Sequence, residues 1–348
     1  MANNTIILTL FSTTGPLPPS TWSSHLPTIL DALTQHIPLS SPSPTSSLFL
    51  DSPSSLSSPL HRVQQHHLPT LSSSSQPLCT SALHSLTPLL LSLSLEAVLG
   101  PLGPLHRSFP HPPSSSPTSA PPPRLAVFDM DSTLIQQEVI DELARSLDLY
   151  ASVSAITEAA MRGEPPYTDF TSSLLARVAL LRGVEPGIWR HLREEVITFS
   201  PGAREVVACL RSDGWVTAVL SGGFINLAAW VKGELGMDFA FANELEEDGE
   251  GKLTGRVKEG TRVVDGERKR ELMLEIARRR GVGREGMLAV GDGSNDLPMM
   301  GEAGLGVAFC AKPKVQERAP ARVNGGSLVD VLYVLGWTEG EIREVMGR

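Results

Sequence analysis

The chain has few of the features that mark several large classes of protein. It contains three cysteines in 348 residues, Cys79, Cys209 and Cys310, which are odd in number and far apart. They offer no disulfide framework and no zinc-ligand spacing, which favours a reducing compartment. No lysine or arginine precedes Arg62, so the basic region of a secretory signal and the arginines of a mitochondrial transit peptide are missing. We therefore predict a cytoplasmic protein.

Long apolar runs and basic blocks are scarce as well. The most apolar stretch, residues 86–105, is interrupted by Glu96 and by several glycines and prolines, so it lacks the roughly 20 apolar residues of a membrane span. The formal net charge is −9 at pH 7, without a basic block, which argues against a nucleic-acid-binding surface. We expect neither a membrane nor a nucleic acid as partner, and a homodimer is left open.

The composition changes near residue 124. Residues 1–123 are rich in Ser, Pro, Leu and His, and Ser/Pro-rich linkers alternate there with short structured patterns. TIILTLF and SLFLD are typical of strands, whereas TWSSHLPTILDALTQHI and CTSALHSLTPLLLSLSLEAVL are typical of helices. Both a small, loop-rich α/β domain and disorder are compatible with this pattern.

Residues 124–348 predict an α/β fold. Short apolar strand patterns, RLAVF, WVTAVL and GMLAV, alternate with amphipathic helical patterns, which is typical of a doubly wound parallel sheet. Residues 135–200 hold helical patterns without a convincing strand, so we expect a helical insert after the first strand. FANELEEDGEGKLTGRVKE predicts a hairpin that turns at Asp248-Gly249. The tail predicts two short helices, the second opened by a Thr338–Glu341 capping box.

A polar motif follows each of the three predicted strands. FDMDSTL follows LAVF, SGGF follows WVTAVL, and GDGSND follows LAV. Because right-handed crossovers bring the carboxyl ends of parallel strands to one edge of a sheet, we expect the three loops to form one crevice. That crevice would collect Asp129, Asp131, Ser221, Asp292, Asn295 and Asp296.

Carboxylates that converge in one crevice repel one another and shift toward protonation. A divalent cation would remove this conflict, and oxygen ligands without His or Cys favour Mg²⁺, which suits a phosphate substrate. A carboxylate beside such a metal can attack phosphorus and form an aspartyl-phosphate. A second carboxyl two residues along the chain can protonate the leaving oxygen and then activate water.

A phosphate also needs cationic and N–H donors. Ser221-Gly222-Gly223 predicts the opening of a helix, where backbone amides and a hydroxyl form an anion cradle. Lys269, at the start of the helical run ERKRELMLEIARRR, would meet the phosphate as a point charge. Each motif alone has an ordinary explanation as a turn, a loop or a solvated charge. Their joint occurrence, in this order and each after a strand, predicts a site.

With these residues the chain resembles the haloacid dehalogenase superfamily of aspartyl-phosphate-forming phosphatases, and within it the phosphoserine phosphatase family. The resemblance extends from about residue 124 to residue 335 and includes FDMDSTL, EVIDELA, ITEAAMRGE, RVALLRG, PGA, SGGF, ANELE, LTG, GDGSNDLPMM and AGLGVAFCAKP. It implies a Mg²⁺-dependent enzyme that converts O-phospho-L-serine to L-serine and phosphate, the last step of serine biosynthesis. It also implies a Rossmann-like core with a helical cap at about 135–200.

The resemblance implies a role for each motif residue. Asp129 would be the nucleophile and Asp131 the general acid and base. Mg²⁺ would be held by the Asp129 carboxylate, the backbone carbonyl of Asp131, and Asp292. The phosphoryl group would be bound by Ser221, Gly222, Gly223 and Lys269, with Asn295 and Asp296 supporting the metal and phosphate site.

The cap would recognise the serine moiety. The resemblance assigns Glu138 and Arg177 to its ammonium and carboxylate, and Met161 and Phe170 to the cap lining. Independently, Phe170, Leu174, Arg177 and Leu181 lie on one helical face, and an arginine on an apolar face needs an anion or a path to the surface. The segment EPPYTDF is longer than the family pattern, so Tyr167 is an alternative to Phe170.

Two other functions are compatible with the motifs. One is a related phosphatase or phosphotransferase that acts on another small phosphomonoester. The other is a phospho-acceptor switch, which needs neither a leaving-group acid nor a cap, so Asp131 and the helical insert favour an enzyme. Many relatives carry small regulatory ACT-type domains before the catalytic part, and residues 1–123 would be a degenerate version of one.

Overall fold

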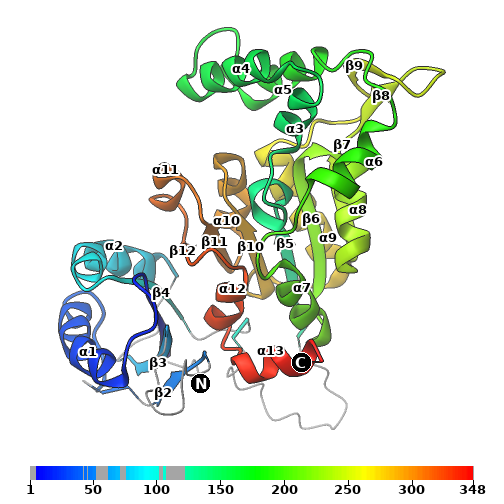
Figure 1. Ribbon diagram of the computed structural model, residues 1–348. Helices are drawn as coiled ribbons and strands as arrows, with labels where there is room; N and C mark the ends of the chain where they lie inside the picture. Colours follow the sequence, from blue (N-terminus) through cyan, green and yellow to red (C-terminus); the bar gives the residue numbers. More distant parts are fainter. Residues whose placement is uncertain are drawn as a thin grey trace.

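The computed structural model describes residues 5–41, 43–44, 46–51, 62–70, 76–101, 105–106 and 122–347. Its larger part is a six-stranded parallel sheet in the order β12-β11-β10-β5-β6-β7 (Figure 1). The strands are β5 (Leu125–Phe128), β6 (Val216–Phe224), β7 (Phe239–Asn243), β10 (Met287–Gly291), β11 (Leu305–Phe309) and β12 (Ala321–Val323). Because β5, β6 and β10 coincide with the three predicted strands, the α/β fold class is confirmed.

Helices cover both faces of this sheet. Alternate residues of a strand point to opposite faces, and both faces of β5 are fully buried, as expected for a central parallel strand. Ala126 and Phe128 lie in one apolar cluster, Leu125 and Val127 in another. The first cluster includes the helices α7 (Ala203–Ser212), α8 (Ile225–Leu235) and α12 (Val329–Val334), and the second includes α9 (Gly266–Arg280) and α10 (Leu297–Glu302).

A helical insert separates β5 from β6 and lies beyond the carboxyl edge of the sheet (Figure 1). It consists of the turn at Met130–Leu134, the helices α3 (Val139–Arg145), α4 (Tyr150–Arg162), α5 (Phe170–Ala179) and α6 (Ile188–His191), and the turn at Leu192–Val196. An isolated bridge between Ile135 and Phe199 closes its base. The predicted helical cap after the first strand is confirmed.

The remaining elements of this part follow the sequence closely. The predicted hairpin is formed by β8 (Leu245–Glu247) and β9 (Leu253–Val257), and its first residues, Phe241 to Asn243, belong to β7 instead. The turn is fixed by Asp248, whose Oδ1 accepts from the amides of Glu250 (2.9 Å) and Lys252 (3.0 Å). The tail forms α12 and α13 (Glu339–Val345), and α13 begins with the predicted capping box.

Residues before 106 contribute a second sheet, antiparallel, in the order β2-β3-β1-β4. Its elements are β1 (Thr5–Ser12), α1 (Pro19–Thr34), β2 (Ser46–Phe49), β3 (Val63–Pro69), α2 (Gln76–Ser92) and β4 (Leu95–Pro101). This β-α-β-β-α-β order is that of ferredoxin-like domains. The described residues follow the α/β alternative, whereas the Ser/Pro-rich segments at 52–61 and 107–121 lie outside the described residues.

The helix predicted over residues 79–99 is wrong at its end. Ser94 has a positive φ of 56°, and from Leu95 onward the chain pairs with β1 in continuous register. Leu, Glu and Ala favour helices intrinsically. Here strand pairing and the burial of Leu95, Ala97 and Leu99 against α1 and α2 outweigh that preference.

The two parts of the chain pack against each other. Arg62, which precedes β3, forms an ion pair with the buried Asp330 on α12. Gln65 Nε2 on β3 donates a hydrogen bond to the Tyr333 carbonyl (3.1 Å), and Val63 belongs to the same apolar cluster as β5. One face of the antiparallel sheet therefore lies against the C-terminal helices. None of the described helices is long and apolar enough to cross a membrane.

Candidate active site

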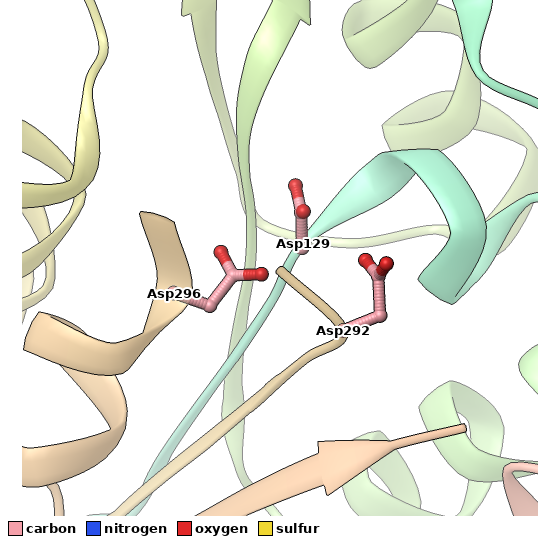
Figure 2. Close-up of side chains that lie close together, drawn as sticks. All are labelled: Asp129, Asp292 and Asp296. Carbon is pink, nitrogen blue, oxygen red and sulfur yellow. The ribbon is translucent and has the colours of Figure 1, made fainter. Parts of the chain in front are cut away.

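Three acidic side chains meet at the carboxyl edge of the parallel sheet. Asp129 follows β5, and Asp292 and Asp296 lie in the loop after the neighbouring strand β10 (Figure 2). Carboxylate oxygens of the three residues all lie within 4.8 Å of one another, so the group could hold a metal ion. The predicted convergence of the first and third motifs is thus present in the structure.

A buried lysine lies among these carboxylates. Lys269 Nζ is 2.7 Å from Asp129 Oδ1 and 2.7 Å from Asp296 Oδ1, and its side chain is 0% exposed. Burial disfavours the charged amine, but the two carboxylates outweigh burial and raise the pKa of Lys269. Lys269 is therefore a fixed cation in the site. It lies in the first turn of α9, which Asp265 caps by accepting from the Arg268 amide.

The carboxylates differ in how far their oxygens are already engaged. Asp296 accepts from Lys269 with Oδ1 and from the Gly293 amide with Oδ2 (3.0 Å), so both its oxygens are in use. Asp129 Oδ1 accepts from the Met130 amide and from Lys269, and neither of these contacts engages Oδ2. Asp292 receives a long contact from the Thr133 hydroxyl (3.4 Å). Asp129 and Asp292 are better placed than Asp296 to bind a metal, and Asp296 orients Lys269.

Burial and mutual repulsion raise the pKa values of two of these carboxyl groups. Burial, followed by the charge of Asp296, raises the pKa of Asp129 well above its usual value, although Lys269 opposes the shift. Burial and the charges of Asp296 and Glu138 raise the pKa of Asp292 to about 7. An oxygen-only cluster with this excess of negative charge is the environment that Mg²⁺ occupies in proteins.

Asp131 has different surroundings from Asp129. The backbone is extended at Asp131 and turns at the next residue, Ser132, which has a positive φ of 53°. Asp131 Oδ1 is buried and has no hydrogen-bond partner among the described residues. Burial, and then the charge of Glu138, raise its pKa well above the usual value. A carboxyl whose pKa is raised is suited to donate a proton.

The SGG motif forms the end of β6 and faces the same site. Its predicted place at the opening of a helix is wrong, because β6 continues to Phe224 and α8 begins only at Ile225. Ser221 is fully buried, and its Oγ accepts from the Gly223 amide (2.8 Å). A β-carbon on Gly223 would lie 3.1 Å from Asp131 Oδ2, so this glycine lets the loop approach Asp131 closely.

Asn243 holds this loop in place, although no role was predicted for it from the sequence. Its Nδ2 donates to the carbonyl of Gly222 (2.8 Å), and its Oδ1 accepts from the Val264 amide (2.8 Å). One buried side chain thereby joins the SGG loop to the segment that leads into α9 and Lys269. The available signal was its position directly after the strand pattern FAF, since polar residues at strand ends in this fold point to the site.

The cap places three of its predicted residues toward the site. Phe170 lies over the SGG loop, because a β-carbon on Gly222 would be 2.8 Å from Phe170 Cζ. Phe170 therefore covers that loop. Glu138 is exposed at the start of α3, accepts from the Ser132 hydroxyl (2.8 Å) and acts electrostatically on Asp131.

Arg177 lies on α5 and is oriented by its Nε, which donates to the Ser173 carbonyl (3.2 Å). Burial lowers its pKa, while Asp141, Glu138 and Asp131 act in the opposite direction, so its guanidinium is within the field of the site's carboxyl groups.

Two predicted residues contribute less to the described geometry. Met161 is the penultimate residue of α4, and its side chain lies outside the described residues. Asn295 lies in the turn at Ser294–Asp296, where its backbone carbonyl packs on Gly266 at the start of α9: a β-carbon there would be 2.7 Å from it.

This fold and site define a class of hydrolase. The chain belongs to the haloacid dehalogenase-like hydrolases, whose family pattern matches residues 126–301. The probable phosphoserine phosphatase of Schizosaccharomyces pombe is 46% identical over 224 residues, which cover 64% of this chain and 73% of that relative.

Two solved structures are also similar. A phospho-aspartyl intermediate analogue of phosphoserine phosphatase has 39% identity and a TM-score of 0.55, covering 61% of this chain and 99% of its own.

The second solved structure resembles both parts of the chain. The unliganded probable phosphoserine phosphatase from Vibrio cholerae has 28% identity and a TM-score of 0.63, covering 100% of this chain and 90% of its own. The likeness therefore includes the antiparallel sheet as well as the catalytic part.

Proposed function

We propose that the chain hydrolyses phosphoserine to serine and phosphate through an aspartyl-phosphate, with Asp129 as the nucleophile and Asp131 as the acid and base. The observation that carries the assignment of roles is the environment of the two aspartates after β5. Asp129 has a lysine amine at 2.7 Å, whereas the buried Oδ1 of Asp131 has no hydrogen-bond partner in the part of the chain that the structure describes. The similarity to phosphoserine phosphatases, one of them a phospho-aspartyl intermediate analogue, supports the same reaction.

The first half of the reaction is transfer of the phosphoryl group to the protein. The Asp129 carboxylate attacks phosphorus, the bond from phosphorus to the serine oxygen breaks, and Asp131 gives its proton to that oxygen. Lys269 and the SGG loop stabilise the charge on the phosphoryl oxygens, because Lys269 is held charged and Ser221 is fixed by its hydrogen bond.

The second half releases phosphate. Asp131, now ionised, accepts a proton from a water molecule that attacks phosphorus, and the bond between phosphorus and Asp129 breaks. Phosphate leaves, and both aspartates return to their starting protonation states. A single residue thus serves as acid and then as base.

The metal that we propose is Mg²⁺, held by Asp129, Asp292 and the backbone carbonyl of Asp131. The cluster fits such an ion because it offers oxygen ligands only and carries uncompensated negative charge. When bound, Mg²⁺ neutralises the carboxylates and polarises the phosphoryl oxygens. Asp296 and Asn295 act indirectly, the first by fixing Lys269 and the second through the backbone contact with α9.

The cap supplies the recognition of serine. We assign the substrate carboxylate to Arg177 and its ammonium to Glu138, with Phe170 and Met161 lining the enclosed space. The position of Phe170 over Gly222 and the electrostatic coupling of Arg177 to Asp131 support this assignment. Both observations support a cap that encloses the phosphoryl site.

Phosphate release from a panel of phosphomonoesters tests the proposed function. Purified protein is supplied with phosphoserine, phosphothreonine, phosphoethanolamine and a sugar phosphate, with Mg²⁺ or with EDTA. We expect phosphoserine to be hydrolysed fastest and only with Mg²⁺, and Asp129→Asn to lose the activity because an amide cannot attack phosphorus. A preference for another ester, or turnover in EDTA, would contradict the proposal.

A further inference from the structure

The β8–β9 hairpin is bound to the cap, although some 70 residues of chain separate them. Leu253 on β9 forms two backbone hydrogen bonds with the segment that follows α5: the Gly183 amide donates to its carbonyl (2.7 Å), and its amide donates to the Val184 carbonyl (3.0 Å). Lys252 adds an ion pair with Glu185 (3.1 Å). The hairpin and this end of the cap therefore form one hydrogen-bonded unit.

The contact is close as well as hydrogen-bonded. Gly255 has a positive φ of 80°, and a β-carbon there would lie 3.0 Å from the carbonyl oxygen of Ala179, the last residue of α5, and 3.0 Å from Arg182 Cβ. Leu253 is 3% exposed and belongs to the same apolar cluster as Leu174 and Val178 on α5. The end of α5 is thus packed directly on the hairpin.

Both ends of this unit lead to the site. The helix α5 carries Phe170 at its start and Arg177 near its end. The hairpin begins two residues after Asn243, whose side chain bonds the carbonyl of Gly222 and the amide of Val264. A continuous series of hydrogen bonds and short chain segments therefore runs from the phosphate loop, through the hairpin, to the helix that bears the specificity residues.

We propose that the β8–β9 hairpin is a brace that fixes α5 relative to the phosphate loop, with Leu253 and Gly255 as positioning residues for Arg177. Neither residue touches substrate. Their effect is to hold the Arg177 guanidinium where the substrate carboxylate arrives, so they act on selectivity for the amino-acid part of the substrate. This inference rests on the proposed function, because it takes Arg177 as the carboxylate ligand.

Two alanine substitutions in the same hairpin test the brace. Gly255→Ala introduces a methyl group against the end of α5. Gly251→Ala is the matched control, because Gly251 has the same φ of 80° and its β-carbon would make only an ordinary contact, 3.5 Å, with Pro186. Both variants carry the same backbone strain, and they differ in whether α5 is displaced.

The two substrates are phosphoserine and phosphoethanolamine, which differ only by the carboxylate. We expect Gly255→Ala to raise KM for phosphoserine by about tenfold and to change kcat/KM for phosphoethanolamine by less than about twofold, because only the carboxylate contact is lost. Gly251→Ala should match wild type on both. Equal losses on both substrates, or equal behaviour of the two variants, would overturn the proposal.

Amide hydrogen exchange without substrate separates this inference from the proposed function. Gly255→Ala should speed exchange at Gly183, Leu253 and the end of α5, and Gly251→Ala should not; unchanged protection would overturn the brace whatever the substrate is. If Gly255→Ala does not fold, Leu253→Ala takes its place, since it adds no atoms and should shift selectivity in the same direction. Failure of the wild-type protein to hydrolyse phosphoserine would contradict the proposed function alone.

Discussion

Removal of Arg62 is expected to destabilise the whole protein, although this residue lies outside the catalytic part. Asp330 is 0% exposed in its side chain, and Arg62, which is 27% exposed, donates to both its oxygens, with Nη1 at 3.1 Å from Oδ2. Losing one partner of a buried ion pair costs about 3–5 kcal/mol, because the other charge stays buried and unpaired. Since Arg62 keeps some exposure, we predict about 3 kcal/mol for Arg62→Met.

Urea unfolding followed by tryptophan fluorescence measures this loss. With a slope of about 3 kcal/mol per molar urea, the midpoint should fall by about 1 M. The matched control is Arg343→Met, which breaks an exposed pair with Glu339 (2.8 Å) on α13 and should cost less than about 1 kcal/mol. Turnover in both variants should stay at the wild-type value, because neither arginine lies in the site.

The pH dependence of the stability loss gives an independent check. Burial raises the pKa of Asp330, and Arg62 opposes that shift. In Arg62→Met the folded-state pKa rises further above the unfolded value, so the penalty is present at neutral pH and disappears as the pH falls and Asp330 becomes neutral. A loss of unfolding free energy in Arg62→Met that is no larger than the loss in Arg343→Met, or that does not decrease as the pH is lowered, would refute the reasoning.

Four further outcomes are expected. Asp131→Asn should slow formation and hydrolysis of the aspartyl-phosphate by about 10²–10⁴-fold per proton transfer, as rapid-quench kinetics would show; unchanged kinetics would assign it a structural role. Arg177→Ala should impair phosphoserine far more than phosphoethanolamine in steady-state assays. A fragment of residues 122–348 should keep Mg²⁺-dependent turnover but unfold at lower temperature in calorimetry. Burial lowers the pKa of His66 to about 4, so the contribution of its neutral ring to the stability of the protein is complete above about pH 6.5 and is lost as the pH falls toward 4. In urea titrations His66→Gln should weaken this pH dependence of stability.

The sequence predicts the parallel sheet and its site because the signals are local. LAVF and GMLAV are apolar runs too short for helices, and each ends in a loop with carboxylates. Fold topology then brings those loops together without further information, since parallel strands share one carboxyl edge. Asp129, Asp292 and Asp296 could therefore be placed in one crevice from the sequence.

Features that depend on tertiary contacts could not be predicted in the same way. The segment LEAVLGP has helical composition and becomes β4 because β1 is available to pair with it. The SGG motif stays extended because Asn243, some 20 residues away, holds the carbonyl of Gly222. The pairing of Arg62 with Asp330 joins residues 268 positions apart and has no local pattern.

The division of labour between Asp129 and Asp131 follows from their surroundings, although both are aspartates in one short motif. Burial of their carboxyl groups raises the pKa of each. Lys269 forms an ion pair with Asp129 Oδ1 (2.7 Å), whereas Asp131 Oδ1 has no hydrogen-bond partner among the described residues. We therefore propose that Asp131 is the residue that keeps its proton until the leaving oxygen needs it.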